Sequence, residues 1–350
     1  MLPISVCIIA KNEEKHIEEC LKRLTPYEME IILVDTGSTD HTIELAKKYT
    51  EQVFSFQWCD DFSAAKNFAL EKASHNLVLS LDCDEYLECI DTKQLLSIMT
   101  AHPKSAGQIL LRNRYKQDGR TSYEKVQVTR LADKRFYHFT GAIHEQLEPL
   151  TDMEKEFCPV PIQVLHVGYD IPKEEMQKKA SRNIALLEKE IASHNSDPYM
   201  YYQLGQSYRQ TGQYEKALSC FDMGLSMDVD PALEYVQAMV EAYGYTLLDL
   251  KRNQEALNLL GVYDDFCTRA DFPFLIGLIY MNNGMLAQAI EEFQKAAAMK
   301  DFSIDGVNSY KAHYNTGVIY ECLGKIKEAR NYYKKCGDYE PAKTRLAQLP

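Results

Sequence analysis

The clearest hydrophobic pattern lies in residues 60–86, where a helical stretch is followed by a short apolar run that ends in acidic residues. Apolar residues within 62–72 recur at nearly helical spacing, which predicts an amphipathic helix. Residues 77–81 have the uninterrupted apolar character of a buried strand. The string Asp82-Cys83-Asp84-Glu85 follows directly. These carboxylates repel one another, so we expect them to need solvent, hydrogen-bond donors or a cation. A solvated acidic turn is the alternative interpretation.

Two strands precede this region and indicate the fold class. Residues 4–9 and 31–34 are short apolar runs typical of buried strands, and the second run ends at Asp35. Between them, apolar residues at helical spacing predict a helix that buries Ile17, Cys20, Leu21 and Leu24. Strands that alternate with helices predict an α/β domain with a parallel sheet, and ligands bind such sheets at the carboxyl ends of the strands.

The pattern is less regular after residue 86. Residues 93–101 predict a helix, and residues 108–112 and 126–131 favour strands. Two strings with histidine follow, Gly141-Ala142-Ile143-His144-Glu145 and His166-Val167-Gly168-Tyr169. A structural pair and a catalytic pair are both open interpretations of His144 and Glu145 at this point.

From residue 172 onward the chain predicts helices only. Residues 173–194 favour one long helix, and after it a set of small and aromatic residues recurs four times at fixed offsets. The interval is close to the roughly 34 residues of a tetratricopeptide repeat. The small residues allow two helices to pack closely, and the large ones fill the space between them. The four sets are Gly205, Tyr208, Ala217, Phe221; Gly244, Leu247, Ala256, Leu260; Gly277, Tyr280, Ala289, Phe293; and Gly317, Tyr320, Ala329, Tyr333.

The length, charge and cysteine pattern of the chain exclude several classes of protein. The length of 350 residues allows two domains, and 45% hydrophobic residues suffice for packed cores. A net charge of −12 argues against a nucleic-acid-binding protein, whose affinity depends on cationic contacts with phosphate. The ten cysteines form no C-x-x-C pair, so no zinc or redox motif is indicated. The scattered cysteines predict a reducing cytoplasm. Residues 1–10 lack a basic segment and are too short to span a bilayer, so we expect a strand there and no transmembrane segment.

The motif D-F-S-x-A-x-N, followed by a buried strand and D-x-D-E, resembles nucleotide-sugar glycosyltransferases of family two, which have the GT-A fold. It is most similar to the branch that includes bacterial glycan-core glucosyltransferases and the peptide S-glycosyltransferases that modify bacteriocins. The resemblance implies a Rossmann-like α/β GT-A domain in residues 1–172, a linking helix in 173–196 and an all-α tetratricopeptide solenoid in 197–350. It also implies inverting transfer of a sugar from a nucleotide sugar, expected to be UDP-linked, to a peptide, protein or glycan acceptor.

The same resemblance implies donor-binding roles for residues at the ends of the first strands. The string V-D-T-G-S-T-D is similar to the family motif in which the first Asp, here Asp35, accepts from the uracil. Asp82 matches the Asp that contacts the ribose. Ala10, Asn12 and Glu13 match the end of the first strand and the N-E pair beside the nucleotide.

Two residues depart from the pattern of this branch. Lys66 stands where Arg is usual, in a position that contacts phosphate or base, and it offers a point charge instead of a bidentate fork. The alternative for Lys66 is an exposed lysine on an amphipathic helix. Cys83 stands where Ala is common.

By the same resemblance, Asp84 would hold a divalent metal on the donor diphosphate, with His166 as a further ligand. A carboxylate with an imidazole suits Mn²⁺ or Mg²⁺. Glu145 is the first candidate for the general base, and His144 is the second. Transfer needs both a base for the acceptor proton and a cation for the departing diphosphate, and one carboxylate cannot serve both.

The repeats leave the partner open. Solenoids of this type have a concave face that binds peptides or proteins, so acceptor binding and partner binding are both expected roles. A homodimer formed through the repeats is another. The alternative from a different class is a tetratricopeptide adaptor whose transferase domain is inactive. The residues identify neither the sugar nor the acceptor.

Overall fold

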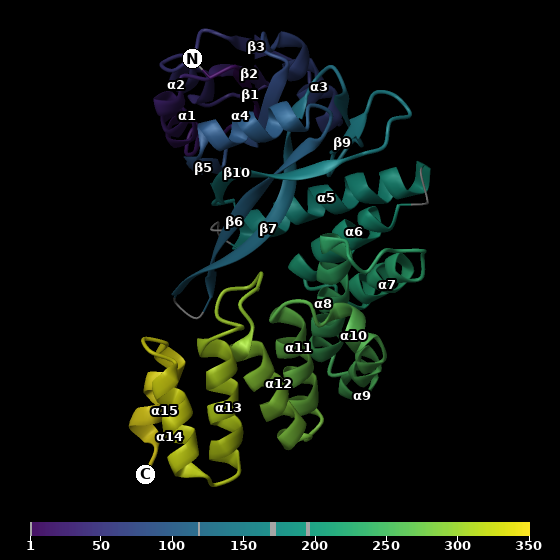
Figure 1. Cartoon of the computed structure of the whole chain (residues 1–350). Coiled ribbons are helices and arrows are strands. Elements are labelled where there is room, and N and C mark those ends of the chain that lie inside the picture. The colour runs from purple at the N-terminus through teal and green to yellow at the C-terminus, as the bar shows by residue number, and fades with distance from the viewer. Residues whose placement is uncertain (1, 118–119, 169–172, 194–196) are drawn as a thin grey trace. The chain divides into compact units, whose positions relative to one another are not determined.

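The structure is a computed structural model that describes residues 2–117, 120–168, 173–193 and 197–350. The chain divides into two compact units, Met1–Asn195 and Ser196–Pro350 (Figure 1). The first unit contains strands and helices, and the second is built from helices. Among the described residues, no helix is both long and apolar enough to cross a bilayer.

An eight-stranded sheet forms the centre of the first unit, in the order β3-β2-β1-β4-β7-β6-β10-β5. The strands β1 to β4 are mutually parallel where they pair, whereas β7 pairs antiparallel with both β4 and β6, and β5 with β10. The sheet is therefore mixed, and the expectation of a parallel sheet is correct only for its first half. The strands of the first unit, including the separate pair β8 and β9, are β1 (Ile4–Ala10), β2 (Glu30–Asp35), β3 (Val53–Ser55), β4 (Leu77–Asp82), β5 (Glu85–Ile90), β6 (Ala106–Gln117), β7 (Arg120–Asp133), β8 (Tyr137–Thr140), β9 (Gln146–Pro149) and β10 (Phe157–His166).

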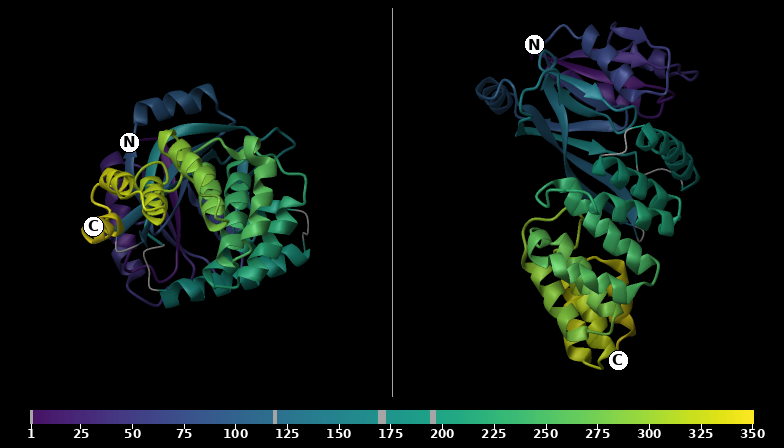
Figure 2. Two further views of the ribbon diagram at one scale, coloured as in Figure 1. Left: turned by 90° about the horizontal axis from the view of Figure 1, so that it is seen from below. Right: turned by 90° about the vertical axis from the view of Figure 1, so that its right-hand side faces the viewer.

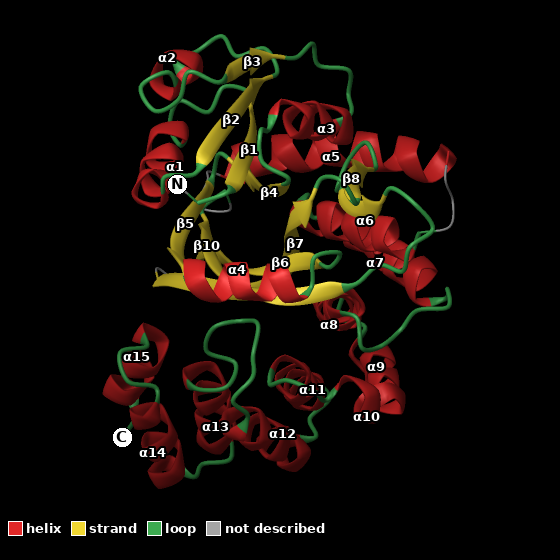
Figure 3. Cartoon of the chain, turned by 45° about the horizontal axis from the view of Figure 1, so that its top comes forward, coloured by secondary structure: helices red, strands yellow, loops and turns green. Residues whose placement is uncertain are grey.

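Helices cover both faces of this sheet (Figure 3). Successive residues of β1 alternate between two cores, because side chains of a strand point to opposite faces in turn. Ile8 packs in one core with residues of α1 and α4, and Cys7 packs in the other with residues of α3 and β8. The predicted buried face of α1 is confirmed for all four of its residues. The helices of the first unit are α1 (Ile17–Leu24), η1 (Thr25–Tyr27), α2 (Thr42–Ala46), α3 (Phe62–Lys72), α4 (Thr92–Ala101) and α5 (Lys173–Ser193).

The second unit consists of helices that pack in successive pairs, such as α6 with α7, α11 with α12 and α13 with α14 (Figure 2). Its helices are α6 (Pro198–Gln210), α7 (Tyr214–Leu225), α8 (Glu234–Asp249), α9 (Asn253–Ala256), η2 (Leu257–Val262), α10 (Tyr263–Phe266), α11 (Asp271–Asn282), α12 (Leu286–Ala298), α13 (Tyr310–Cys322), α14 (Ile326–Lys335) and α15 (Glu340–Gln348).

Glycine contacts confirm how the paired helices approach. A Cβ atom added to Gly277 would lie 2.7 Å from the ring of Phe293, and the same contact recurs between Gly205 and Phe221 and between Gly317 and Tyr333. Only a residue without a Cβ permits these approaches.

The second repeat differs from the predicted register by one residue. Gly244 faces Leu259 instead of Leu260, and Leu259 is the buried one. The reason is local, because residues Leu257–Val262 form a 3₁₀ helix, whose tighter winding rotates the side chains relative to an α-helix.

Candidate active site

Three parallel strands end side by side at one edge of the sheet. The strand register pairs Ala10 with Asp35 across β1 and β2, and Ile9 with Asp82 across β1 and β4. Ala10, Asp35 and Asp82, which were predicted separately as donor-binding residues, therefore lie next to one another at the carboxyl ends of their strands. This is the edge at which ligands bind in α/β sheets.

The loops that follow β1 and β2 hold each other in place. Asn12 Oδ1 accepts a hydrogen bond from the backbone nitrogen of Thr39 at 2.8 Å. The buried Asp35 carboxylate accepts from the backbone nitrogens of Gly37 and Ser38 at 3.1 Å each. Asn12 has a φ of 56°, a left-handed conformation that asparagine tolerates better than most residues. Both side chains thus shape the loops, and their contacts with a nucleotide stay predictions.

The pKa of the Glu13 carboxyl group is raised at this edge. Burial, followed by the charge of Asp84, raises the pKa of Glu13 to about 7. Burial is the larger cause, so the raised pKa mainly indicates that the Glu13 carboxyl is poorly solvated at this edge.

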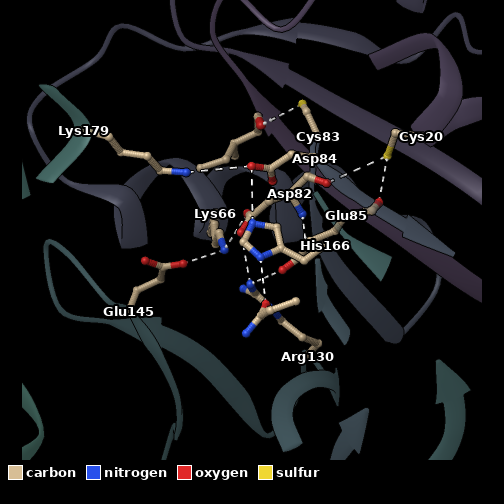
Figure 4. Close-up of polar contacts among 12 residues, drawn as sticks. Cys20, Lys66, Asp82, Cys83, Asp84, Glu85, Arg130, Glu145, His166 and Lys179 are labelled. Carbon is tan, nitrogen blue, oxygen red and sulfur yellow. Dashed lines mark hydrogen bonds and ion pairs between the residues drawn. The ribbon is translucent and has the colours of Figure 1, made fainter. Parts of the chain in front are cut away.

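Two cations hold Asp82 (Figure 4). Lys66 Nζ lies 3.2 Å from Asp82 Oδ1, and Arg130 Nη2 lies 3.0 Å from Oδ2. Burial alone would raise the pKa of Asp82, but the two cations outweigh burial and hold it well below its usual range. Both carboxylate oxygens are therefore already paired with positive charge.

Arg130 also neutralises Glu85. This residue is only 2% exposed, and its Oε1 lies 2.7 Å from Arg130 Nη2. Its Oε2 accepts a hydrogen bond from the backbone nitrogen of Asp82 at 3.0 Å. As expected, these acidic residues pair with hydrogen-bond donors and a cation. The alternative of a fully solvated acidic turn is wrong for Glu85, because β5 begins at this residue and its side chain is buried.

Lys66 connects the acidic edge with the segment that carries Glu145. Lys66 Nζ lies 2.5 Å from Glu145 Oε1, and only 4% of the lysine side chain is exposed. Burial alone would lower the pKa of Lys66, but the carboxylates of Asp82 and Glu145 outweigh burial and raise it. The alternative of an exposed surface lysine is therefore wrong. In this structure Lys66 contacts two carboxylates, and its contact with the donor stays a prediction.

Helix α3 positions the Glu145 segment through the residue next to Lys66. Asn67 Nδ2 donates to the carbonyl of Phe139 at 2.8 Å, and the backbone nitrogen of Phe139 donates to Asn67 Oδ1 at 2.8 Å. The backbone nitrogen of Phe62 donates to the carbonyl of Ala142 at 2.9 Å. The D-F-S-x-A-x-N motif therefore fixes β8 and the following loop against the helix, which brings Glu145 to Lys66.

His144 is neutral and incompletely hydrogen-bonded. Its φ is 52°, an uncommon conformation for a residue with a side chain, and such strain concentrates at functional sites. Burial lowers the pKa of His144 to about 4. Its Nε2 is buried and has no hydrogen-bond partner among the residues that the structure describes. A buried polar atom of this kind is suited to bind a group of an incoming ligand.

Asp84 and His166, the predicted metal ligands, face each other. Asp84 Oδ2 lies 3.4 Å from His166 Nε2. On the other side of the ring, Asn113 Oδ1 lies 2.9 Å from His166 Nδ1. Asn113 Nδ2 donates to Glu124 Oε2 at 3.1 Å, which fixes the orientation of the amide. In a neutral imidazole, Nδ1 then carries the proton and the lone pair of Nε2 points toward Asp84, as in metal sites whose second shell orients the histidine.

Asp84 and His166 pack directly against Gly168. A Cβ atom at Gly168 would collide with both Asp84 Oδ2 and His166 Nε2. A carboxylate and an imidazole side by side are ligands that suit a divalent cation such as Mn²⁺. Within the described residues no group of three or more His, Cys, Asp or Glu side chains could hold a metal. The other ligands would therefore come from donor phosphate oxygens and water.

Cys83 is the middle residue of the D-x-D string. Its Sγ donates to the carbonyl of Ile9 at 3.5 Å, and the side chain is buried. The middle position of the D-x-D string thus faces the core, whereas Asp82 and Asp84 face the site.

Three polar residues of this site were not identified from the sequence: Arg130, Asn113 and Lys179. Arg130 and Asn113 lie on long strands whose sequence gave no sign of which neighbours they would have. Lys179 lies on α5 with its Nζ 3.8 Å from Asp84 Oδ2, although the sequence indicated only a linking helix there. Their position depends on strand pairing and helix packing, which no local pattern of residues indicates.

Comparisons with known proteins agree with the sequence patterns. Residues 5–151 match Glycosyl transferase family 2, and residues 198–228, 273–301 and 310–343 match the tetratricopeptide repeat. The matched repeats are the three that contain Gly205, Gly277 and Gly317. The predicted fold class, an α/β GT-A-like domain followed by helical tetratricopeptide repeats, is confirmed.

Three relatives illustrate the similarity. A TPR repeat-containing protein of Synechococcus elongatus is 29% identical over 67% of this chain and 60% of its own length. The SPbeta prophage-derived glycosyltransferase SunS of Bacillus subtilis is 24% identical over 91% of this chain and 76% of its own length. The lipopolysaccharide core biosynthesis glycosyltransferase LpsC of Rhizobium meliloti is 29% identical over 42% of this chain and 58% of its own length. The chain thus spans less than two thirds of the first and third of these relatives. Residues 5–151 therefore form a glycosyltransferase domain of family 2, which this chain joins to C-terminal tetratricopeptide repeats.

Proposed function

We propose that this chain is an inverting glycosyltransferase that moves a sugar from a UDP-linked nucleotide sugar to a peptide, protein or glycan acceptor. The observation that carries the proposal is the bridge made by Lys66. The ammonium group of Lys66 contacts both Asp82, at the donor edge of the sheet, and Glu145, the base candidate. A base and a donor site at this separation suit a single displacement at the anomeric carbon.

In this proposal each residue of the site has a separate role in the transfer. The acceptor oxygen or sulfur attacks the anomeric carbon while Glu145 takes the acceptor proton. Lys66 holds the Glu145 carboxylate in position, and the paired cations keep Asp82 ionised for the donor. Asp84 and His166 would hold Mn²⁺ or Mg²⁺, and a divalent cation there stabilises negative charge on a departing diphosphate.

Removal of the Asp84 carboxylate tests the metal assignment. We expect Asp84→Ala to abolish transfer and to weaken UDP binding in the presence of Mn²⁺, while the circular dichroism spectrum stays unchanged. Glu71→Ala removes an exposed carboxylate from α3 and serves as the control. Tight UDP binding that ignores both EDTA and Asp84→Ala would exclude the metal site.

Sugar-nucleotide hydrolysis separates the enzyme from the alternative, an inactive tetratricopeptide adaptor. Purified protein should release free sugar slowly from its correct donor, which a screen of sugar nucleotides by mass spectrometry detects. An adaptor would hydrolyse none of them and would bind none of them at micromolar concentration.

For the repeats we propose binding of the acceptor or of a partner protein, with homodimerisation as the second role. The first unit ends at Asn195 and has its own cores, so residues 1–195 should retain UDP binding and slow hydrolysis. Binding energy from distant parts of an acceptor can orient the reacting centre, so transfer to a large acceptor should suffer most. If the full chain and residues 1–195 transfer equally well to a large acceptor, the repeats do not bind the acceptor. Dimerisation, which analytical ultracentrifugation measures, or docking to another protein would then be the better account of the repeats.

We also propose that the reaction takes place in the reducing cytoplasm. All ten cysteines lie within the described residues and are free thiols. In oxidising compartments cysteines are usually paired.

A further inference from the structure

Helix α5 brings one cation to the acidic edge and a second one to the start of α3. Lys179 Nζ lies 3.8 Å from Asp84 Oδ2 (Figure 4). Arg182 follows three residues later, and its guanidinium carbon lies 5.7 Å from the centre of the Phe62 ring at the start of α3. Residues three apart lie on the same side of a helix. The helix belongs to the first unit but lies outside residues 5–151, the part that matches the glycosyltransferase family.

α5 has a buried apolar side and contacts the first unit through Lys179 and Arg182. Ala180 and Leu187, which are seven residues apart, are fully buried. This spacing places them on one side of the helix, next to the turn that carries Lys179 and Arg182. Both cations therefore lie on a helix whose apolar side is buried.

Lys66 and Arg130, two cations inside the site, are already paired with carboxylates of the protein. Lys66 contacts Asp82 and Glu145, and Arg130 contacts Asp82 and Glu85. A nucleoside diphosphate adds negative charge at an edge where the pKa of Glu13 is already raised. Bound phosphates need positive charge that internal carboxylates have not neutralised.

Lys179 can supply that charge. Its side chain is 48% exposed, compared with 4% for Lys66. At 3.8 Å the contact with Asp84 is looser than a hydrogen bond, so the ammonium keeps donors for another acceptor.

We propose that Lys179, with Arg182 beside it, binds the diphosphate of the nucleotide-sugar donor, so that α5 completes a donor site begun by the family domain. This inference rests on the proposed function. In the transfer, the acceptor oxygen or sulfur forms a bond to the anomeric carbon, and the bond from that carbon to the diphosphate oxygen breaks. The acceptor proton goes to Glu145, and the electron pair of the broken bond stays on the diphosphate, where Lys179 stabilises it.

Calorimetric titration of the full chain with UDP and with uridine tests the diphosphate contact. We expect Lys179→Ala to weaken UDP binding roughly tenfold to a hundredfold, as for loss of a hydrogen bond to a charged group. Uridine lacks phosphates, so its affinity should not change. Lys178→Ala removes the same charge from an exposed neighbouring residue and should bind UDP like the parent. Lys179→Arg keeps the charge and should restore most of the UDP affinity.

The other outcomes overturn the inference in distinguishable ways. If the parent binds UDP and Lys179→Ala binds it equally well, the diphosphate contact is absent while the proposed function stands. If Lys179→Ala weakens uridine and UDP by the same factor, Lys179 acts through the shape of the site. If the only effect of Lys179→Ala is tighter Mn²⁺ binding to the nucleotide-free protein, Lys179 serves only to balance the negative charge of Asp84. If the parent binds neither UDP nor any other nucleoside diphosphate, the proposed function and this inference fail together.

Discussion

Lys66→Met tests whether the buried lysine holds the two halves of the site together. Methionine has nearly the same length and volume but no charge, so it removes the ammonium and leaves the packing of α3 largely intact. Glu145 then loses the cation that lies 2.5 Å from its carboxylate, and Asp82 keeps only Arg130. The negative charges of Glu145 and Asp82, which Lys66 balances in the parent protein, are then only partly balanced.

The structure sets the expected size of the effect. Breaking a buried ion pair by removing one partner costs about 3 to 5 kcal/mol of unfolding free energy. Asp82 is 39% exposed and retains Arg130, whereas the Glu145 side chain is only 11% exposed. Most of the cost therefore comes from Glu145, and we expect a value near the lower limit, about 3 kcal/mol. For a unit of this size that corresponds to a fall in Tm of roughly 6 to 12 °C.

Thermal and urea unfolding measure this loss, and donor hydrolysis measures the catalytic consequence. We expect hydrolysis to fall on the order of 10²-fold because Glu145 is no longer held in position. Lys72→Met is the control on the same helix. Lys72 is exposed and its Nζ lies 4.6 Å from the Phe68 ring centre, so its loss should cost less than about 1 kcal/mol.

A double variant isolates the pair. In Lys66→Met with Glu145→Gln the only one of the two carboxylates left beside the methionine is Asp82, which keeps Arg130, so the two losses should not add. We expect a coupling energy of roughly 1 to 3 kcal/mol. Additive losses, or a Lys66→Met protein with parental stability and turnover, would refute the view that Lys66 links Glu145 to the donor edge.

Three further predictions follow from the same geometry. Glu145→Gln should keep UDP affinity but lower turnover on a hydroxyl acceptor by roughly 10²- to 10⁴-fold, and by less on a more acidic thiol; near-parental turnover on the hydroxyl acceptor would assign the base elsewhere. Gly168→Ala should push a methyl group against Asp84 and His166, so calorimetry should show loss of Mn²⁺-dependent UDP binding in a folded protein; unchanged metal dependence would contradict the proposed cation site. His144 has a pKa of about 4 when folded, below its ordinary 6.5, so between these pH values the unfolded chain binds more protons and stability falls as the pH falls. His144→Gln should remove at most about 3 kcal/mol of that pH dependence in urea unfolding between pH 4.5 and 7, and parallel curves for both proteins would exclude this role.

The sequence by itself determined the elements that follow from local periodicity. Residues 62–72 and 77–81 gave α3 and β4 because their apolar residues repeat with the period of a helix or fill a short strand. The repeated glycines predicted the helix pairs of the second unit, since close approach requires a residue without a Cβ. The strand ends at Asp35 and Asp82 predicted the functional edge, because the carboxyl ends of parallel strands meet there.

Local patterns were insufficient wherever the winding or pairing of elements changed. The sheet is mixed because β7 enters it antiparallel between β4 and β6, which no period within its own residues indicates. Leu259 replaces Leu260 in the second repeat because the helix there tightens into a 3₁₀ turn.

The tertiary structure alone decided the partners of the charged residues. Arg130 reaches Asp82 and Glu85 because β7 pairs with β4, and Lys179 reaches Asp84 because α5 belongs to the same compact unit. The burial of Lys66 between Asp82 and Glu145 likewise joins segments far apart in the chain. Strand order and helix docking are set by the burial of apolar surface over the whole unit, whereas a local stretch of sequence specifies only its own period.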